Sequence, residues 1–272
     1  LPDAVGAASG RIGEVLLAPY RLGLSATLGQ GEAGAGTGES QGVLERLIGP
    51  LVYRRSITEL SGAYLADYRT EGLQAELSAA ERAAYDAARE RYLGYARERG
   101  LTPTSARGWQ RFVFAASRTP EGRAALEGYR EQRQIAYAPE RKFGVLAELL
   151  RRHRGERVLV FTNDNRTAYE VARRFLLPII THQTRLPARR TILERFREGR
   201  WPALVTSRVL NEGVDVPAAN IAVILSGTAS VREHVQRLGR ILRKAPGKEA
   251  VLYEVLSRTT GEAFVSQRRR QH

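Results

Sequence analysis

From Lys142 onward the sequence alternates short, continuously apolar segments with longer segments that carry apolar residues at helical spacing. The apolar segments are 158–161, 179–181, 203–206, 221–225 and 250–255, and the helical ones are 142–153, 166–177, 187–198 and 230–242. A strand that is apolar at every position must be covered on both faces, as in parallel sheets flanked by helices. The pattern therefore predicts an α/β fold. Such sheets bind ligands at the carboxyl ends of their strands, so the candidate loops follow Phe161, Thr181, Thr206 and Leu225.

Helical signals dominate the region before Lys142. Ser78 and Glu81 form a capping box, and a run rich in alanine, arginine and glutamate continues to Gly100. A second helix is expected near 105–117, and a third begins at Pro120. Trp109 and Phe112 follow helical spacing, which favours a place in a core over a stacking platform for bases. The sequence predicts a mostly helical module over residues 60–138.

Residues 1–57 carry weaker signals. An apolar segment at 15–17 and a turn at 18–20 precede 21–27, which favours a short buried strand. The glycine-rich stretch 29–42 favours a loop. A short helix is expected at 43–48, and a short extended piece at 51–53.

The charge is distributed unevenly along the 272 residues. Residues 1–140 carry 17 basic and 17 acidic side chains and residues 141–272 carry 26 and 12, so the net charge of +14 lies in the second half. Only three of the 43 basic residues are lysine. Arginine suits phosphate recognition, and a basic half-chain indicates a nucleic-acid or nucleotide partner. Codon bias in a GC-rich genome would explain the arginine to lysine ratio equally well, but it would not explain the asymmetry.

Composition excludes several classes of protein. Hydrophobic residues at 43% and charged residues at 26% are usual for globular chains, and no apolar stretch approaches the roughly 20 residues that span a bilayer. The absence of cysteine excludes disulfide scaffolds and thiolate zinc sites, and the four histidines are too scattered to suggest a metal site. We expect a cytoplasmic protein.

Two segments in the second half carry candidate chemistry. Arg240 and Arg243 are three residues apart on one expected helical face, with Gln236 one turn earlier, and paired guanidinium groups can clamp a polyphosphate. The alternative is a solvated basic helix face. Gly213 and Asp215 lie in a loop after a predicted strand, where a glycine permits close backbone approach to a ligand. An aspartate in such a loop is more commonly a turn former.

Together these segments resemble the second RecA-like domain of superfamily 2 helicases. The resemblance rests on 206–207 with 212–217 (motif V) and on 236–243 (motif VI), while 24–27 resembles the SAT element and 160–163 resembles motif IV. The segments 180–184, 205–210, 225–227 and the end of the chain look like the XPB subfamily of DNA helicases. The resemblance implies a RecA-like parallel sheet with a helical thumb-like insertion.

The resemblance also implies roles for individual residues. Arg240 and Arg243 would be arginine fingers that stabilise charge on the γ-phosphate of ATP, and Gln236, Gly213 and Asp215 would line the same cleft. Ser25 and Thr27 of the SAT element would couple the ATP state to domain movement, or would simply end a strand. The residues that would contact backbone phosphates of DNA are Thr162, Asn163, Thr184, Ser207 and Arg208.

The sequence contains no G-x-x-x-x-G-K-[ST] phosphate loop and no Asp-Glu pair of the kind that holds magnesium. In the family both lie before the SAT element, so we expect a fragment that begins just after them. ATP and Mg²⁺ would be bound mainly by the preceding half, and the fragment would be inactive alone. The expected division is 1–57 as a remnant of the first RecA-like domain, 58–140 as the thumb-like module and 141–272 as the second RecA-like domain.

We therefore expect the C-terminal motor half of an ATP-dependent DNA helicase or translocase acting in DNA repair, with 3′-5′ polarity by family resemblance. Its partners would be DNA, the preceding helicase half in cis and a nuclease. Two alternatives stay open: a non-catalytic nucleic-acid-binding scaffold, and an RNA-directed superfamily 2 helicase.

Overall fold

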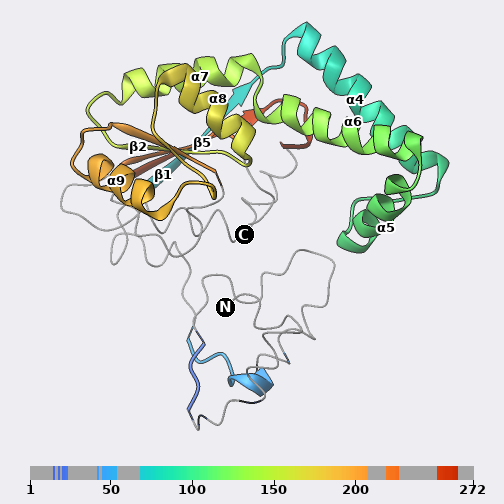
Figure 1. Cartoon of the computed structure of the whole chain (residues 1–272), viewed down its shortest axis with the longest axis horizontal. Coiled ribbons are helices and arrows are strands. Elements are labelled where there is room, and N and C mark those ends of the chain that lie inside the picture. Colours follow the sequence, from blue (N-terminus) through green and yellow to red (C-terminus); the bar gives the residue numbers. More distant parts are fainter. Residues whose placement is uncertain are drawn as a thin grey trace.

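A six-stranded parallel sheet and an arm of helices make up most of the structure, a computed structural model of the chain (Figure 1). The structure describes residues 15, 18, 20–23, 42, 45–53, 68–207, 219–226 and 250–262. The strands are β1 (Tyr68–Ala75), β2 (Val158–Phe161), β3 (Ile179–Ile180), β4 (Ala203–Thr206), β5 (Ile221–Ile224) and β6 (Ala250–Ser257). Their order in the sheet is β1-β6-β5-β2-β4-β3, and every neighbouring pair is parallel.

Helices cover both faces of the sheet. They are α7 (Glu140–Arg152), α8 (Asn165–Phe175) and α9 (Leu186–Arg197). Alternate residues of β2 point to opposite faces: Val158 and Val160 pack with α7 and α8, whereas Leu159 and Phe161 pack with α9. All four are buried, which is why the strand reads as a continuous apolar run. The predicted parallel sheet is confirmed.

The helical arm extends to one side of the sheet and consists of α4 (Ala79–Glu98), α5 (Ala106–Ser117) and α6 (Pro120–Tyr137) (Figure 1). The capping box at Ser78 is present, Gly100 follows α4 with a φ of +60°, and Pro120 occupies the start of α6. The predicted helices are therefore confirmed here, as are the three predicted over 142–198, all within two residues.

Aromatic side chains form the core of the arm. Phe112 is fully buried and makes edge contacts with Tyr92 and Tyr95, and Trp109 packs against the same cluster. The Trp109 and Tyr129 ring centroids are 4.4 Å apart. Phe112 and Trp109 thus hold the three helices together, as their spacing predicted.

Strand β1 was not expected. It lies inside the range 58–140 that the sequence assigns to a helical module, yet it pairs with β6 over its whole length at the edge of the sheet. From Thr70 to Ala75 exposed residues alternate with partly or fully buried ones, because successive side chains point to opposite faces and only one face is covered here. The strand therefore carries charged residues and a glycine instead of an apolar run. This strand connects the arm to the sheet.

The N-terminal segments fit the sequence interpretation less well. Residues 45–47 are helical as expected, but residues 21–23 are exposed and form no strand. Leu22 is 78% exposed, so the prediction of a buried strand over 21–27 is wrong for the part of it that the structure describes. A strand is stable only when neighbours pair with it, and no described strand lies against these residues. Residues 24–27 and the predicted helix at 230–242 lie outside the described residues.

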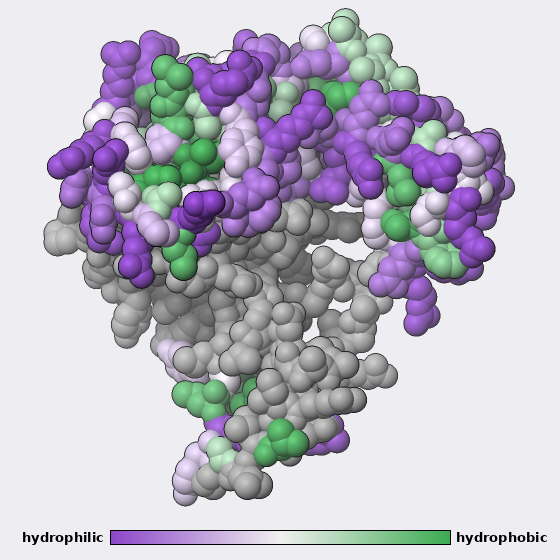
Figure 2. Space-filling view, in the orientation of Figure 1, coloured by the Kyte–Doolittle hydropathy of each residue, from purple (hydrophilic) through white to green (hydrophobic). Residues whose placement is uncertain are grey.

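The visible surface of both the sheet domain and the arm is mostly hydrophilic, with small apolar patches between (Figure 2). Among the described residues, no helix combines the length and apolar character needed to span a membrane.

Candidate functional site

Polar residues follow four neighbouring strands at one edge of the sheet. They are Thr162 and Asn163 after β2, Thr181 after β3, Ser207 after β4 and Ser226 near the end of β5. Because these strands are parallel and adjacent, their carboxyl ends lie together. The tertiary structure therefore brings Thr162, Asn163, Ser207 and the loop containing Thr184 to one edge, as the sequence predicted.

Thr162 is fully buried and stabilises the turn after β2. Its backbone N–H donates to the Thr206 carbonyl at 2.9 Å, and its hydroxyl donates to the Asp164 carbonyl at 3.0 Å. Asp164 in turn caps α8 by accepting from the Thr167 N–H at 2.8 Å. The Thr162 hydroxyl is thus engaged inside the protein, so this residue shapes the loop and does not present a donor to a phosphate in this conformation.

Asn163 is fixed by the neighbouring strand end. Its backbone N–H donates to the Ser226 hydroxyl oxygen at 2.8 Å, and the Leu225 N–H donates to the Phe161 carbonyl at 3.0 Å. Ser226 is fully buried. The sequence interpretation did not select Ser226 as a site residue. The available signals were its position directly after a predicted strand end and its place in the XPB-like segment 225–227.

Hydrogen bonds to the hydroxyl oxygens of its two threonines stabilise the loop 181–184. The Thr181 N–H donates to the Thr184 hydroxyl oxygen at 2.9 Å, and the Gln183 N–H donates to the Thr181 hydroxyl oxygen at 3.2 Å. Accepting one bond leaves the Thr184 hydroxyl its own hydrogen, which it can donate to a ligand. The guanidinium of Arg189 lies 3.4 Å from the Thr181 carbonyl and 3.5 Å from that of Thr184.

Sequence reasoning did not select four side chains in or beside this loop, namely Asn165, Tyr169, His182 and Gln183. Asn165 Nδ2 lies 3.1 Å from His182 Nδ1, and the Tyr169 hydroxyl donates to Gln183 Oε1 at 3.2 Å. His182, Gln183 and Tyr169 are exposed. They present amide, imidazole and phenol groups next to Thr184, all capable of hydrogen bonding to a polar ligand.

The electrostatics of the edge favour an anion. Helices α8 and α9 begin there, since they follow β2 and β3. The Asp164 carboxylate caps the N-terminus of α8, whereas α9 has no side-chain cap and no acidic residue in its first turn. A helix N-terminus carries partial positive charge and unpaired N–H groups, which suit phosphate. Arg166 and Arg185 are exposed at these two helix starts. The edge therefore combines short polar groups with positive potential.

Several predicted site residues lie outside the described residues, namely Ser25, Thr27, Arg208, Gly213, Asp215, Gln236, Arg240 and Arg243. Within the described part of the chain, no three histidine, aspartate or glutamate side chains are grouped so as to hold a metal ion.

Residues 141–245 match the helicase conserved C-terminal domain family. Over 258 residues the chain is 38% identical to the DNA 3'-5' translocase XPB2 of Sulfurisphaera tokodaii, an alignment that covers 95% of this chain and 57% of that protein. The chain belongs to the XPB-type superfamily 2 helicases. The superfamily predicted from motifs V and VI and the XPB subfamily predicted from 180–184, 205–210, 225–227 and the end of the chain are thereby confirmed. The XPB-type chain spans about half the length of this relative.

A second relative matches the XPB-type chain over a shorter region. The DNA 3'-5' helicase XPB of Mycobacterium tuberculosis is 36% identical over 135 residues, which cover 49% of this chain and 25% of that protein.

Two solved structures share the fold. The helicase domain of Pyrococcus furiosus Hef superposes with a TM-score of 0.61 at 17% identity, covering 88% of the XPB-type chain and 66% of the Hef chain. The C-terminal part of the Fun30 ATPase domain gives a TM-score of 0.54 at 15% identity, with 75% and 90% covered. At these identities the likeness establishes the fold alone, and it confirms the predicted RecA-like class.

Proposed function

We propose that the chain is the C-terminal motor half of an ATP-dependent DNA helicase or translocase that acts 3′-5′ in DNA repair. The observation that carries this proposal is the row of short polar groups and the uncapped N-terminus of α9 at the carboxyl edge of a RecA-like sheet. The region that matches the helicase C-terminal family, 141–245, contains this edge and the two predicted arginine fingers.

The proposed contacts with a DNA strand use neutral donors at strand ends. Thr184 and Ser207 would donate hydroxyl hydrogens to backbone phosphates, and Arg208 would add a charged contact. Asn163 would present its side-chain amide while Ser226 holds its backbone. Thr162 would act through the shape of the turn, because its hydroxyl bonds to Asp164.

The proposed nucleotide contacts lie on residues outside the described part of the chain. Arg240 and Arg243 would stabilise the charge that develops on the γ-phosphate during hydrolysis, and Gln236, Gly213 and Asp215 would line the cleft. ATP and Mg²⁺ would be bound mainly by a preceding helicase half. Ser25 and Thr27 would link that half to this one, and the chain alone would hydrolyse no ATP.

The proposed domain organisation is the one that the helicase resemblance implies. It has 1–57 as the end of the first RecA-like domain, 58–140 as the thumb-like module and 141–272 as the second RecA-like domain. Strand β1 would then belong structurally to the second domain although it lies within the range 58–140 and precedes the helices of the arm. Relatives in Arabidopsis thaliana are named as helicase/translocase subunits of a general transcription and DNA repair factor, so a larger complex at chromosomal DNA is the proposed setting. A nuclease partner stays an expectation from resemblance.

Arg240→Ala in the full-length protein tests the motor role. We expect DNA-stimulated ATP hydrolysis to fall by about three orders of magnitude, the usual effect of losing an arginine finger, while ATP binding persists. Arg151→Ala is the matched control, because Arg151 is exposed at the far end of α7. Unchanged hydrolysis in Arg240→Ala would remove the finger from this role.

Two alternatives give different results. A non-catalytic scaffold would bind nucleic acid with strong salt dependence but show no hydrolysis when the preceding half is present. An RNA-directed helicase would be stimulated by RNA in preference to single-stranded DNA in a direct competition.

A further inference from the structure

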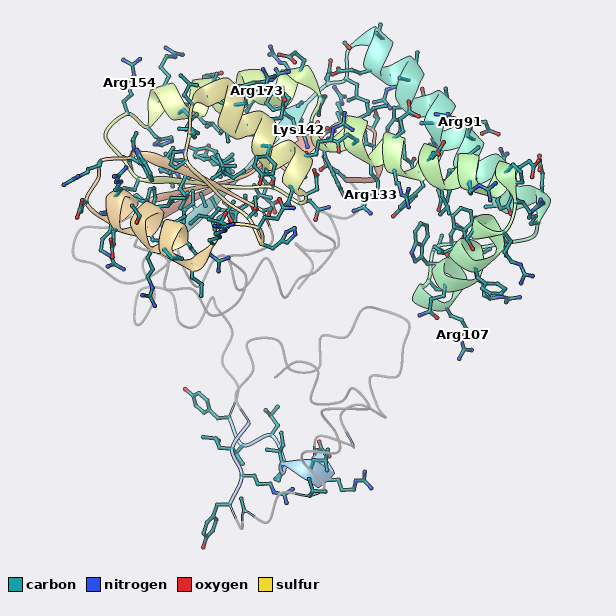
Figure 3. All side chains as sticks on the ribbon, viewed as in Figure 1. Arg91, Arg107, Arg133, Lys142, Arg154 and Arg173 are labelled. Atoms are coloured by element: carbon teal, nitrogen blue, oxygen red, sulfur yellow. The ribbon has the colours of Figure 1, made fainter. Side chains whose placement is uncertain are left out.

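Lys142 is one of three lysines in the chain and is completely buried. It lies in the first turn of α7, where the sheet meets the base of the helical arm (Figure 3). Its Nζ donates to Glu262 Oε2 at 2.6 Å and to the Leu225 carbonyl at 2.8 Å. Leu225 and Glu262 are 83 and 120 residues away in sequence, so the contact exists only in the folded chain.

Burial of this charge is costly. Complete burial lowers the pKa of the Lys142 ammonium, and the carboxylate of Glu262 opposes that change by stabilising the charged form. Removing two ions from water generally costs about as much as their attraction returns, so a buried pair is weak evidence of stabilisation. The position of the pair points instead to a geometric role.

Lys142, the basic member of the pair, is hydrogen-bonded to the end of β5. The Leu225 carbonyl accepts from Lys142, and the next residue, Ser226, accepts the backbone N–H of Asn163. Two hydrogen bonds and the Leu225–Ser226 peptide unit therefore connect Lys142 with the turn after β2. That turn carries one of the proposed phosphate contacts.

Glu262, the acidic member of the pair, is hydrogen-bonded to the end of β6. Glu262 Oε2 also accepts from the Ser257 N–H at 3.0 Å, and the Ser257 hydroxyl donates to the Ala136 carbonyl near the end of α6 at 2.5 Å. The ends of β5, β6 and α6 and the beginning of α7 are thus connected at one point.

We infer that Lys142 is a positioning residue that holds the Leu225–Ser226 turn against Glu262 and thereby sets the backbone of Asn163 at the nucleic-acid edge. Lysine suits this place because its ammonium is compact and directs separate hydrogens to a carbonyl and a carboxylate, whereas the planar fork of arginine needs more room. The inference that the position of the Asn163 backbone governs DNA affinity rests on the proposed function.

The test removes both charges together, with Lys142→Met and Glu262→Leu in one variant, so that neither ion is left unpaired. The first measurement is hydrogen exchange of the Asn163 amide in this chain. We expect exchange on the order of tenfold faster than in the unmodified chain, because the acceptor Ser226 is no longer held. The matched control is Arg91→Met with Glu131→Leu, which removes an exposed ion pair between α4 and α6 and should leave this amide unchanged.

The second measurement is DNA-stimulated ATP hydrolysis by the full-length protein. The concentration of single-stranded DNA at half-maximal stimulation should rise about fivefold to tenfold in the double variant, while the KM for ATP stays within twofold. A pair with a purely structural role would leave both the Asn163 exchange and this DNA concentration unchanged, which would overturn the inference.

A second variant guards against loss of folding. Ser226→Ala keeps the ion pair and removes only the last link to Asn163, and it should raise the half-saturating DNA concentration to a similar extent. No change in Ser226→Ala would contradict the proposed path. If the unmodified full-length protein is not stimulated by DNA, the proposed function fails, and the Asn163 exchange alone decides whether Lys142 positions the turn.

Discussion

Gly128 of α6 lies against the backbone of Ala88 in α4 so closely that a Cβ at position 128 would be 2.7 Å from the Ala88 carbonyl oxygen. Real Cβ atoms do not approach backbone oxygen to this distance, so any side chain there must push the two helices apart. The contact between α4 and α6 is the main packing surface of the arm, and it depends on this glycine.

Gly128→Ala should therefore destabilise the arm, by about 1–3 kcal/mol as for other overpacked sites, despite the higher helix propensity of alanine. Gly94→Ala on α4 is the matched control, because its Cβ would meet only the Glu90 carboxylate at 3.6 Å. That variant should gain up to about 1 kcal/mol. Denaturant unfolding followed by circular dichroism distinguishes them, and equal stabilisation of both would contradict the close contact.

Glu81 should make stability pH-dependent. Its carboxylate loses solvation on burial, which raises its pKa, but hydrogen bonds from the Glu140 and Ser78 backbones and from the Ser78 hydroxyl outweigh this and hold the pKa below its ordinary value of 4.5. A lowered pKa contributes stability above pH 4.5 that is lost as pH falls through the folded-state pKa. We expect Glu81→Gln to be less stable than the unmodified chain at pH 7, and we expect this difference to shrink as the pH falls below 4.5. Urea unfolding of both proteins from pH 3 to 7 measures it, and a constant difference would contradict the prediction.

Tyr92 should make stability depend on pH in the alkaline range. Burial, with a smaller contribution from Tyr129, raises the pKa of the Tyr92 phenol from 10.0 to about 12. A raised pKa gives stability that is complete below pH 10 and is lost as pH rises toward 12. Tyr92→Phe keeps the ring contacts with Phe112 and Tyr129 and should lose less stability across this range. Thermal unfolding from pH 8 to 11.5 is the measurement, and parallel profiles of the two proteins would exclude Tyr92 as the group responsible.

Thr184→Ala should weaken binding of single-stranded DNA about threefold to tenfold, because it removes a neutral hydrogen-bond donor proposed to contact a phosphate. Thr184→Ser keeps the hydroxyl and should bind nearly as well as the unmodified protein. Thr191→Ala changes an exposed threonine on α9 whose hydroxyl already donates to Pro187, and it is the matched control. The slope of log affinity against log salt should stay the same in all three, since no charge is removed. Fluorescence anisotropy of labelled oligonucleotides measures both quantities.

The local sequence determined most elements between residues 78 and 206. The apolar run Val158–Phe161 and the capping box at Ser78 each specify one structure by themselves, so β2 and the start of α4 could be predicted to the residue. Strand β1 could not. It pairs with only one neighbouring strand, and only one of its faces is partly covered. Its residues therefore lack the apolar pattern that identifies a central strand.

The candidate site divides in the same way. The carboxyl ends of the predicted strands indicated the loops after Phe161, Thr181 and Thr206, because this edge of a parallel sheet is a binding edge. The resemblance to superfamily 2 helicases then singled out Thr162, Asn163, Thr184 and Ser207 in those loops. Nothing local indicated that the Thr162 hydroxyl bonds to Asp164, or that Ser226 accepts the Asn163 N–H.

By itself, the sequence determined the fold class, the family and the helices of the arm, because hydrophobic period, capping and turn residues act over a few neighbouring positions. Only the tertiary structure decided that β1 joins the sheet and that Lys142 meets Leu225 and Glu262. Such contacts connect residues more than 80 positions apart. Their partners are fixed by the packing of the whole sheet, which no local pattern encodes.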